Sequence, residues 1–259
     1  MSGYARHWGQ GAAPALLLHC SLASSGAWDG VARALADHLS ATAPDLIGHG
    51  RGPDWDGQQD FHDQNTEYAA RFLPEGRCHL IGHSFGATIA LRLAEEHPQG
   101  IASLTLIEPV LFAAARGRPG HAAHEQALAG LDPAFRADDR AAAARVFLSV
   151  WGEGPEFDDL SDPQQRNILD RIHLIAASNG ALHDDTARIL PRLGQVTAPT
   201  LLLAGGDCAP VIPDILDHLE AGLPDATRAS VSGAGHMLPI THPAQVAAEI
   251  AAHITAHPV

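Results

Sequence analysis

Short, mainly apolar runs, most of which lead into a glycine- or histidine-rich loop, constrain the fold of this chain most. These runs occupy residues 15–18, 43–47, 78–81, 104–107, 200–203 and 227–231. Because apolar residues follow one another instead of alternating with polar ones, both faces of each strand must be covered. Helical patterns separate the runs, with apolar residues at three- and four-residue spacing in 31–39, 88–96 and 243–254. The sequence therefore predicts an α/β fold with a mainly parallel, doubly wound sheet of about seven strands.

The strand pattern stops between residues 112 and 194, and helical signals replace it. Ser161 is a predicted helix N-cap, and Asp162 and Pro163 follow it in the first turn. The alanine-rich stretch 134–150 also has the character of a helix. We predict a helical cap over residues 112–194, inserted into a core formed by residues 1–111 and 195–259.

The basic residues exclude several mechanisms, since all 16 are arginine and the chain has no lysine. A phosphate-binding P-loop and Schiff-base, pyridoxal or serine–lysine chemistry all need the missing amine. The net charge of −14 argues against a nucleic-acid partner, because phosphate neutralisation requires clustered basic residues. We therefore expect a small-molecule substrate and no cofactor.

The cysteines and histidines give no sign of a metal site or a disulfide framework. Cys20, Cys78 and Cys208 are widely spaced and form no C-x-x-C pair. The 17 histidines lack the H-E-x-x-H context of a zinc enzyme, so we expect no metal. No signal-peptide or membrane-length apolar segment occurs, which predicts a cytoplasmic protein without a membrane partner. The sequence does not distinguish a monomer from a homodimer.

Residues 82–86 read Gly-His-Ser-Phe-Gly, which fits the pattern G-x-S-x-G. An apolar strand precedes the pattern and a helical pattern follows it directly. A serine at so tight a strand-to-helix turn has a strained backbone, and only glycine avoids a collision two positions to either side. The turn would lift the hydroxyl of Ser84 above the sheet as a nucleophile.

With this serine turn and three further segments, the sequence closely resembles the α/β-hydrolase fold family over nearly its whole length. The matching segments are His-Cys-Ser at 19–21, Asp-Leu-Ile-Gly-His-Gly-Arg-Gly at 45–52, the serine turn, and Gly-Ala-Gly-His at 233–236. The resemblance implies a serine nucleophile, a late histidine base, an acid between them in chain order, and a helical cap. The chain departs from the family in two ways. The short stretch before Ala15 implies that one initial antiparallel strand is missing, and Cys20 replaces the usual glycine.

His236 is the expected base, because its flexible loop after the last strand would let the imidazole reach Ser84. The acid has two candidates. Many relatives carry it three residues after a glycine that ends the strand at 200–203, which here gives Cys208 or Ala209, so Asp207 is the nearest carboxylate. Other relatives carry it directly after the preceding strand, where Glu108 stands. A buried carboxylate there needs a partner such as histidine, so we prefer Glu108 and keep Asp207 as the alternative.

The oxyanion hole is predicted to use two backbone N–H groups. One belongs to Phe85, directly after the nucleophile, and by family match Ser21 supplies the other. Trp28 and Trp151 are candidates to line an apolar pocket, and Trp55 lies in a loop near the same edge. On the predicted cap helix, His173 and its neighbour Arg171 are candidates to meet a substrate carbonyl or carboxylate.

These residues predict a serine hydrolase that cleaves an ester or lactone of a small, mainly apolar carboxylic acid through an acyl-enzyme on Ser84. The same triad also suits carbon–carbon bond hydrolysis or perhydrolysis. A further alternative is a ligand receptor or signalling protein that carries the triad but turns over little. By the family resemblance, a serine at the turn argues against dehalogenase and epoxide hydrolase chemistry, which use aspartate there.

Overall fold

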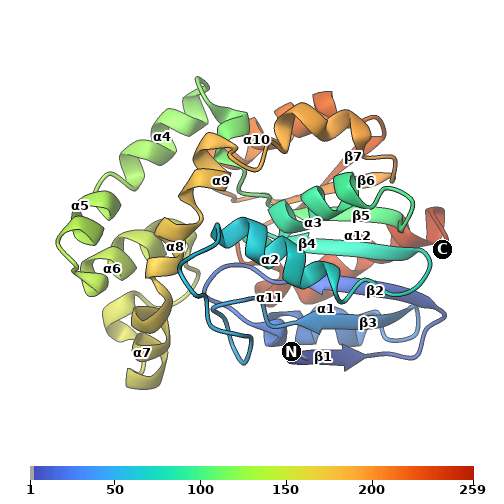
Figure 1. Cartoon of the computed structure of the whole chain (residues 1–259), viewed down its shortest axis with the longest axis horizontal. Helices are drawn as coiled ribbons and strands as arrows, with labels where there is room; N and C mark the ends of the chain where they lie inside the picture. The colour runs from blue at the N-terminus through green and yellow to red at the C-terminus, as the bar shows by residue number, and fades with distance from the viewer. Residues whose placement is uncertain (1–2) are drawn as a thin grey trace.

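The computed structural model describes residues 3–259, in which a seven-stranded sheet forms the centre of the molecule (Figure 1). The strands are β1 (Ala5–Trp8), β2 (Ala13–Leu18), β3 (Leu39–Pro44), β4 (Cys78–His83), β5 (Ile101–Ile107), β6 (Thr200–Gly205) and β7 (Ala226–Val231). Their order across the sheet is β1-β3-β2-β4-β5-β6-β7. Only the β1–β3 pair is antiparallel, and every other neighbouring pair is parallel. The predicted mainly parallel α/β fold is confirmed.

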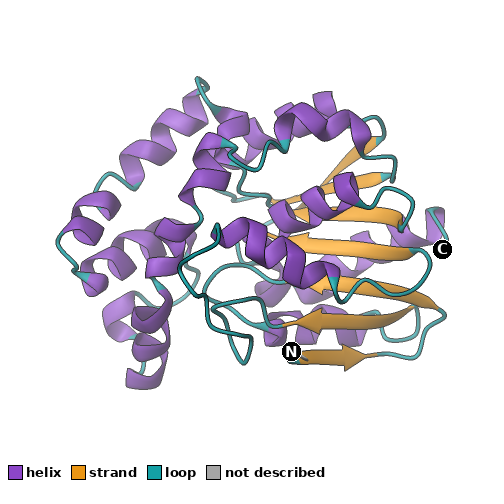
Figure 2. Ribbon diagram, viewed as in Figure 1, coloured by secondary structure: helices purple, strands orange, loops and turns teal. Residues whose placement is uncertain are grey.

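Helices cover both faces of this sheet, as the uninterrupted apolar strands require (Figure 2). The helices of the core are α1 (Asp29–Ala34), α2 (Phe61–Ala70), α3 (Phe85–Glu96), α10 (Val211–Gly222), α11 (Leu238–Thr241) and α12 (Pro243–Ala256). In β2, Leu16 and Leu18 join the apolar cluster under α2, α3 and α10. Leu17, on the opposite face, joins the cluster under α1, α11 and α12. The side chains of this one strand thus pack into both buried layers, one on each face of the sheet.

The strand predicted at residues 43–47 begins and ends earlier, as β3. Asp45 ends it, because its carboxylate accepts the N–H of Ser25 and the N–H of Arg51, both at 2.7 Å. The chain therefore turns away from the sheet, and Leu46 and Ile47 are buried in the loop that follows. Their apolar character reflects a buried loop and not a longer strand.

Between β5 and β6 the described chain forms helices and short 3-10 turns without any strand. These helices are α4 (Pro119–Ala127), α5 (Leu131–Arg136), α6 (Arg140–Trp151), α7 (Asp162–Arg171), α8 (His173–Ala177) and α9 (Asn179–Asp184). In Figure 1 they gather beside the end of the sheet where the parallel strands finish. Among residues 3–259, no helix combines the length and the apolar character that crossing a membrane requires.

Two local predictions for this segment have different outcomes. Ser161 forms a capping box with Gln164 at the start of α7, so the predicted helix start is confirmed. The helical character predicted over 134–150 is confirmed except at residues 137–139, where the chain breaks between α5 and α6. Asp138 has a left-handed backbone with φ of 54°, and the Asp139 side chain caps α6 by accepting the N–H of Ala142 at 2.9 Å.

Candidate active site

Ser84 lies at the sharp turn between β4 and α3, with φ of 56° and ψ of −119°. This backbone conformation is strained for a residue with a side chain and presents the hydroxyl at the end of the sheet. The flanking glycines allow the turn to close. A Cβ atom on Gly82 would collide with the carbonyl of Gly86, and one on Gly86 would collide with the backbone of Leu18 and His19.

The imidazole of His236 connects the serine to a buried carboxylate. Ser84 Oγ donates to His236 Nε2 at 3.0 Å, and His236 Nδ1 donates to Glu108 Oε2 at 2.7 Å. The three side chains come from the ends of β4 and β5 and from the loop after β7. The exposed fractions are 6% for Ser84, 7% for His236 and 0% for Glu108, so water screens this chain of hydrogen bonds only weakly.

Both oxygens of the Glu108 carboxylate are engaged. Oε2 contacts His236, while Oε1 accepts the backbone N–H of Gly205 at 2.8 Å. Asp207, the alternative acid, is exposed, and its own backbone N–H donates to the carbonyl of Ala234 at 2.9 Å. The structure therefore brings Glu108 to the histidine, and Asp207 makes no hydrogen bond to it.

Three further side chains hold the segment that carries His236, and sequence reasoning did not identify two of them. His83 Nε2 donates to the carbonyl of His236 at 2.8 Å, and burial lowers the pKa of His83 well below its ordinary value. Glu153 Oε1 accepts the N–H of Met237 at 2.7 Å. The ring of Trp151 lies edge-on to the His236 ring, with the ring centres 4.5 Å apart. Glu153 comes from the segment after α6, and nothing in the local sequence signals that contact.

Ser21 lies in the loop after β2, and Phe85 is the first residue of α3, directly after Ser84. The backbone N–H of neither residue has a backbone acceptor among residues 3–259. His19 fixes the first loop. Its Nδ1 donates to the carbonyl of Cys20 at 2.7 Å, and its Nε2 accepts the N–H of Leu46 at 3.0 Å. Burial lowers the pKa of His19 to about 4, which keeps the ring in the neutral form that this pair of bonds needs.

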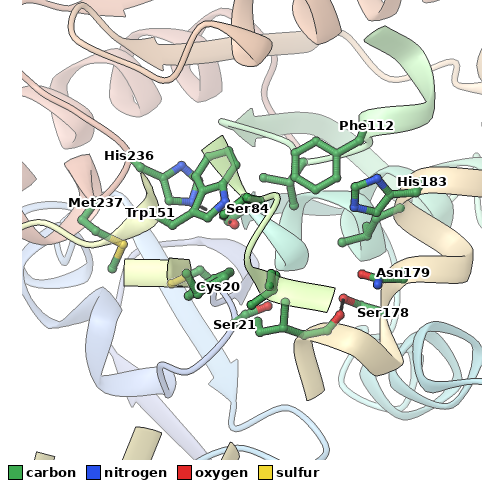
Figure 3. Close-up of a pocket in the computed structure, with 16 residues that line it drawn as sticks. Cys20, Ser21, Ser84, Phe112, Trp151, Ser178, Asn179, His183, His236 and Met237 are labelled. Atoms are coloured by element: carbon green, nitrogen blue, oxygen red, sulfur yellow. Dashed lines mark hydrogen bonds between the residues drawn. The ribbon is translucent and has the colours of Figure 1, made fainter. Parts of the chain in front are cut away.

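A cavity opens directly onto Ser84 and His236 (Figure 3). Its volume is about 590 Å³ when the open, solvent-filled mouth is counted, and the enclosed part is much smaller. Its apolar wall includes Val110, Phe112, Leu131, Phe147, Trp151 and Ile175. Most of this wall belongs to the helical segment between β5 and β6, so that segment closes the site from above.

A family model described as the alpha/beta hydrolase family matches residues 15–249. The chain belongs to the alpha/beta hydrolase family. Lipase LipV of Mycobacterium tuberculosis is 29% identical, over 95% of this hydrolase and 94% of the lipase. A pimeloyl-(acyl-carrier protein) methyl ester esterase of Aeromonas salmonicida is 30% identical, over 95% of this chain and 96% of that protein.

Solved structures show the same fold. A hydrolase from Pseudomonas aeruginosa superposes on this alpha/beta hydrolase with a TM-score of 0.74 and 21% identity, over 96% of this chain and 93% of that one. A haloalkane dehalogenase variant from Bradyrhizobium elkanii gives a TM-score of 0.74 at 21% identity, over 97% and 92% of the two chains. At this identity the likeness concerns the fold and not the reaction.

The structure places four predicted pocket candidates of the hydrolase away from the cavity. Trp28 is buried in the layer with α1 and α12, on the face of the sheet opposite α2 and α3, and α1 begins directly after it. His173 is exposed at the start of α8 and lies at a separate surface hollow. Arg171 also turns away from the cavity, since its guanidinium donates to Asn167. Trp55 packs edge-on against Phe61. Of the predicted pocket residues, Trp151 lines the cavity.

One group of side chains in this hydrolase has the composition of a metal site. His121 and Glu125 lie one turn apart on α4, and His183 on α9 brings a third potential ligand atom, all within 4.8 Å of one another. The carboxylate that sequence inspection missed comes from Glu125, whose Oε1 lies 3.6 Å from His183 Nδ1. Two imidazoles and a carboxylate suit a divalent transition metal. The group is half-exposed, and one of its members, His183, also lines the cavity that opens onto Ser84.

Proposed function

We propose that this alpha/beta hydrolase is a serine hydrolase that cleaves an ester or lactone of a small, mainly apolar carboxylic acid. The observation that carries the proposal is the hydrogen-bonded series Ser84–His236–Glu108, which opens onto an apolar cavity. The fixed serine–base–acid contacts are those that nucleophilic catalysis requires. The small volume and neutral apolar wall favour a compact acyl group.

In the proposed mechanism, Ser84 Oγ attacks the carbonyl carbon of the substrate while His236 Nε2 takes the hydroxyl proton. Glu108 holds the ring with its proton on Nδ1 and stabilises the imidazolium that forms. The N–H groups of Phe85 and Ser21 receive the oxyanion of the tetrahedral intermediate. Collapse expels the alcohol, which takes the proton from His236. Water, deprotonated by the same ring, then releases the acid from Ser84.

We assign different tasks to the two parts of the chain. Residues 1–111 and 195–259 form the core that carries the three catalytic side chains. Residues 112–194 form the cap, which supplies the apolar wall and excludes water from the reacting groups. Phe112, Leu131 and Ile175 support this division, because they line the cavity from three separate cap elements.

The names of the related proteins support an ester as the substrate. One relative is named a lipase and another a methyl ester esterase, and both match nearly the whole of this chain. A third, from Pseudomonas putida, is named N-formylmaleamate deformylase and is 27% identical over 91% of this chain and 86% of that protein. Ester cleavage is the reaction class that two of these three names print.

Labelling with phenylmethylsulfonyl fluoride tests the proposal. We expect a single adduct on the peptide that contains Ser84, together with loss of p-nitrophenyl ester cleavage. Ser84→Ala should lower kcat by at least about 10⁴-fold, while Ser149→Ala, an exposed serine on the cap, should leave it unchanged. Full activity of Ser84→Ala would refute the proposed function.

A further inference from the structure

The cavity has a polar end that the proposed mechanism does not use. Ser178, Asn179 and His183 line it, and Figure 3 shows them on the far side of Phe112 from His236. Ser178 lies at the end of α8, and the other two belong to α9. Between these residues and Ser84 the wall is apolar. The cavity therefore has Ser84 and His236 at one end, an apolar section in the middle, and a polar section at the other end.

Two of these side chains have free hydrogen-bonding capacity. The Ser178 hydroxyl donates to the carbonyl of Ile175 at 2.8 Å, which leaves its oxygen free as an acceptor. The amide of Asn179 makes no hydrogen bond to any of residues 3–259, although it lines the cavity. An amide placed beside an apolar wall without a protein partner is well matched to a ligand group that both donates and accepts.

The polar end carries no formal charge that would bind an ion. Within residues 3–259, no arginine and no carboxylate lines the cavity, and the chain has no lysine. Burying a free carboxylate here would leave it without a cation, which is strongly unfavourable.

The direction of the substrate follows from the position of the base. The leaving alcohol must lie within reach of His236 Nε2, because that atom returns the proton. Figure 3 shows Trp151 and Met237 on that side of Ser84, and the polar end on the other. The acyl chain therefore points along the apolar wall toward Ser178 and Asn179.

We propose that Asn179, with Ser178, binds an uncharged hydrogen-bonding group at the distal end of the acyl chain, such as a carboxamide or a hydroxyl. The preferred substrate is then an ester whose acid has an apolar middle and a neutral polar terminus. This inference rests on the proposed function, since it assigns the acyl side of the same site.

Three matched sets of p-nitrophenyl esters test it on the full-length enzyme. The acyl chains, prepared at several lengths, end in an isopropyl group, a carboxamide or a carboxylate, which have nearly the same shape. At the best chain length we expect the carboxamide ester to exceed the carboxylate ester in kcat/KM. In Asn179→Leu, the carboxamide-to-isopropyl ratio of kcat/KM should fall by about fivefold to tenfold, the value of one hydrogen bond.

Two further variants make the result specific. Asn167→Leu, the same exchange at an exposed position of α7, should leave the ratio unchanged. Asn179→Asp conserves size, so it tests the same contact if the leucine variant fails to fold, and it should lower kcat/KM for the carboxylate ester further.

The outcomes separate the two proposals. Cleavage of the isopropyl esters with an unchanged ratio in Asn179→Leu, or a preference for the carboxylate ester, would overturn this inference alone. An enzyme that cleaves none of the esters and takes no label on Ser84 would overturn the proposed function, and the present inference with it.

Discussion

Buried neutral histidines should make the fold of this protein sensitive to mild acid. His19, His49 and His62 are each at most 1% exposed. Burial lowers their pKa values from 6.5 to about 4, about 3 and about 3. Their contacts favour the neutral ring, since His19 Nε2 accepts the N–H of Leu46 and the guanidinium of Arg92 faces His62 Nδ1. A proton on either ring nitrogen would turn that nitrogen into a donor, and it would then face another donor.

The direction of the effect follows from where the proton binds more readily. In the unfolded chain these rings take up protons below about pH 6.5, whereas in the folded protein they stay neutral to lower pH. Their contribution to stability is therefore complete above pH 6.5 and is lost as the pH falls below it. A pH of about 5 lies about 1.5 units below the pKa of a histidine in the unfolded chain. At this pH, protonation of each ring in the unfolded chain lowers the free energy of unfolding by about 2 kcal/mol.

Three rings together should lower the free energy of unfolding by about 6 kcal/mol between about pH 7.5 and about pH 5. This loss is comparable to the whole stability of a typical domain, which is roughly 5–15 kcal/mol. Burial also lowers the pKa values of His79 and His124 to about 4, so they act in the same direction. We expect cooperative unfolding in this window, before most carboxylates are protonated.

Urea unfolding, followed by tryptophan fluorescence at a series of pH values, measures the effect. The slope of the unfolding free energy against pH should approach about 4 kcal/mol per unit near pH 5.5 for these three rings. His62→Gln should reduce the total change by about 2 kcal/mol, while His7→Gln, at an exposed position of β1, serves as the control. A total change below about 2 kcal/mol would refute the reasoning.

Four substitutions test the proposed site and the turn that carries Ser84. Glu108→Gln should lower kcat by about 10³-fold or more with Ser84 still in place, whereas Asp207→Asn should retain activity; the reverse pattern in esterase assays would reassign the acid. Glu153→Ala should lower kcat about tenfold at constant KM and constant Tm, because the loop of His236 loses its partner, and a change in Tm alone would contradict a positioning role. Gly86→Ala should destabilise the fold by about 2 kcal/mol or more, measured by urea unfolding, because the added methyl group has no space.

The fold was predictable from the sequence because its signals are local. Apolar runs place five of the seven strands closely, namely β2, β4, β5, β6 and β7, although β7 is mostly not buried. The run at 43–47 overlaps only the end of β3. β1 was not predicted, since its four residues at the edge of the sheet are only half-buried and have no apolar run. The break between α5 and α6 was missed for a different reason. Helix propensity favours the whole alanine-rich stretch, but one left-handed residue, Asp138, interrupts it.

Side-chain partners across the fold were harder to predict than positions along the chain. Glu108 was recognisable as a strand-end carboxylate, but its choice over Asp207 depends on how β5 and β6 place their ends beside His236. For Trp28, the position of the loop was predicted correctly, but the direction of the side chain was not. Its loop lies at the end of the sheet where the cavity opens, yet its side chain enters the layer under the other face.

The contacts of His236 link the helical segment between β5 and β6 to the proposed base in a way that neither part provides alone. Glu108 fixes one ring nitrogen, and His83 holds the carbonyl of the same residue from within the serine turn. From the cap side, Trp151 packs on the ring, and Glu153 holds the next peptide. A glycine-rich approach to the histidine leaves its loop free to move, so these contacts must supply the order. A shift of this helical segment by the length of one hydrogen bond would release the Glu153 contact, so the position of the segment and the position of the proposed base are coupled.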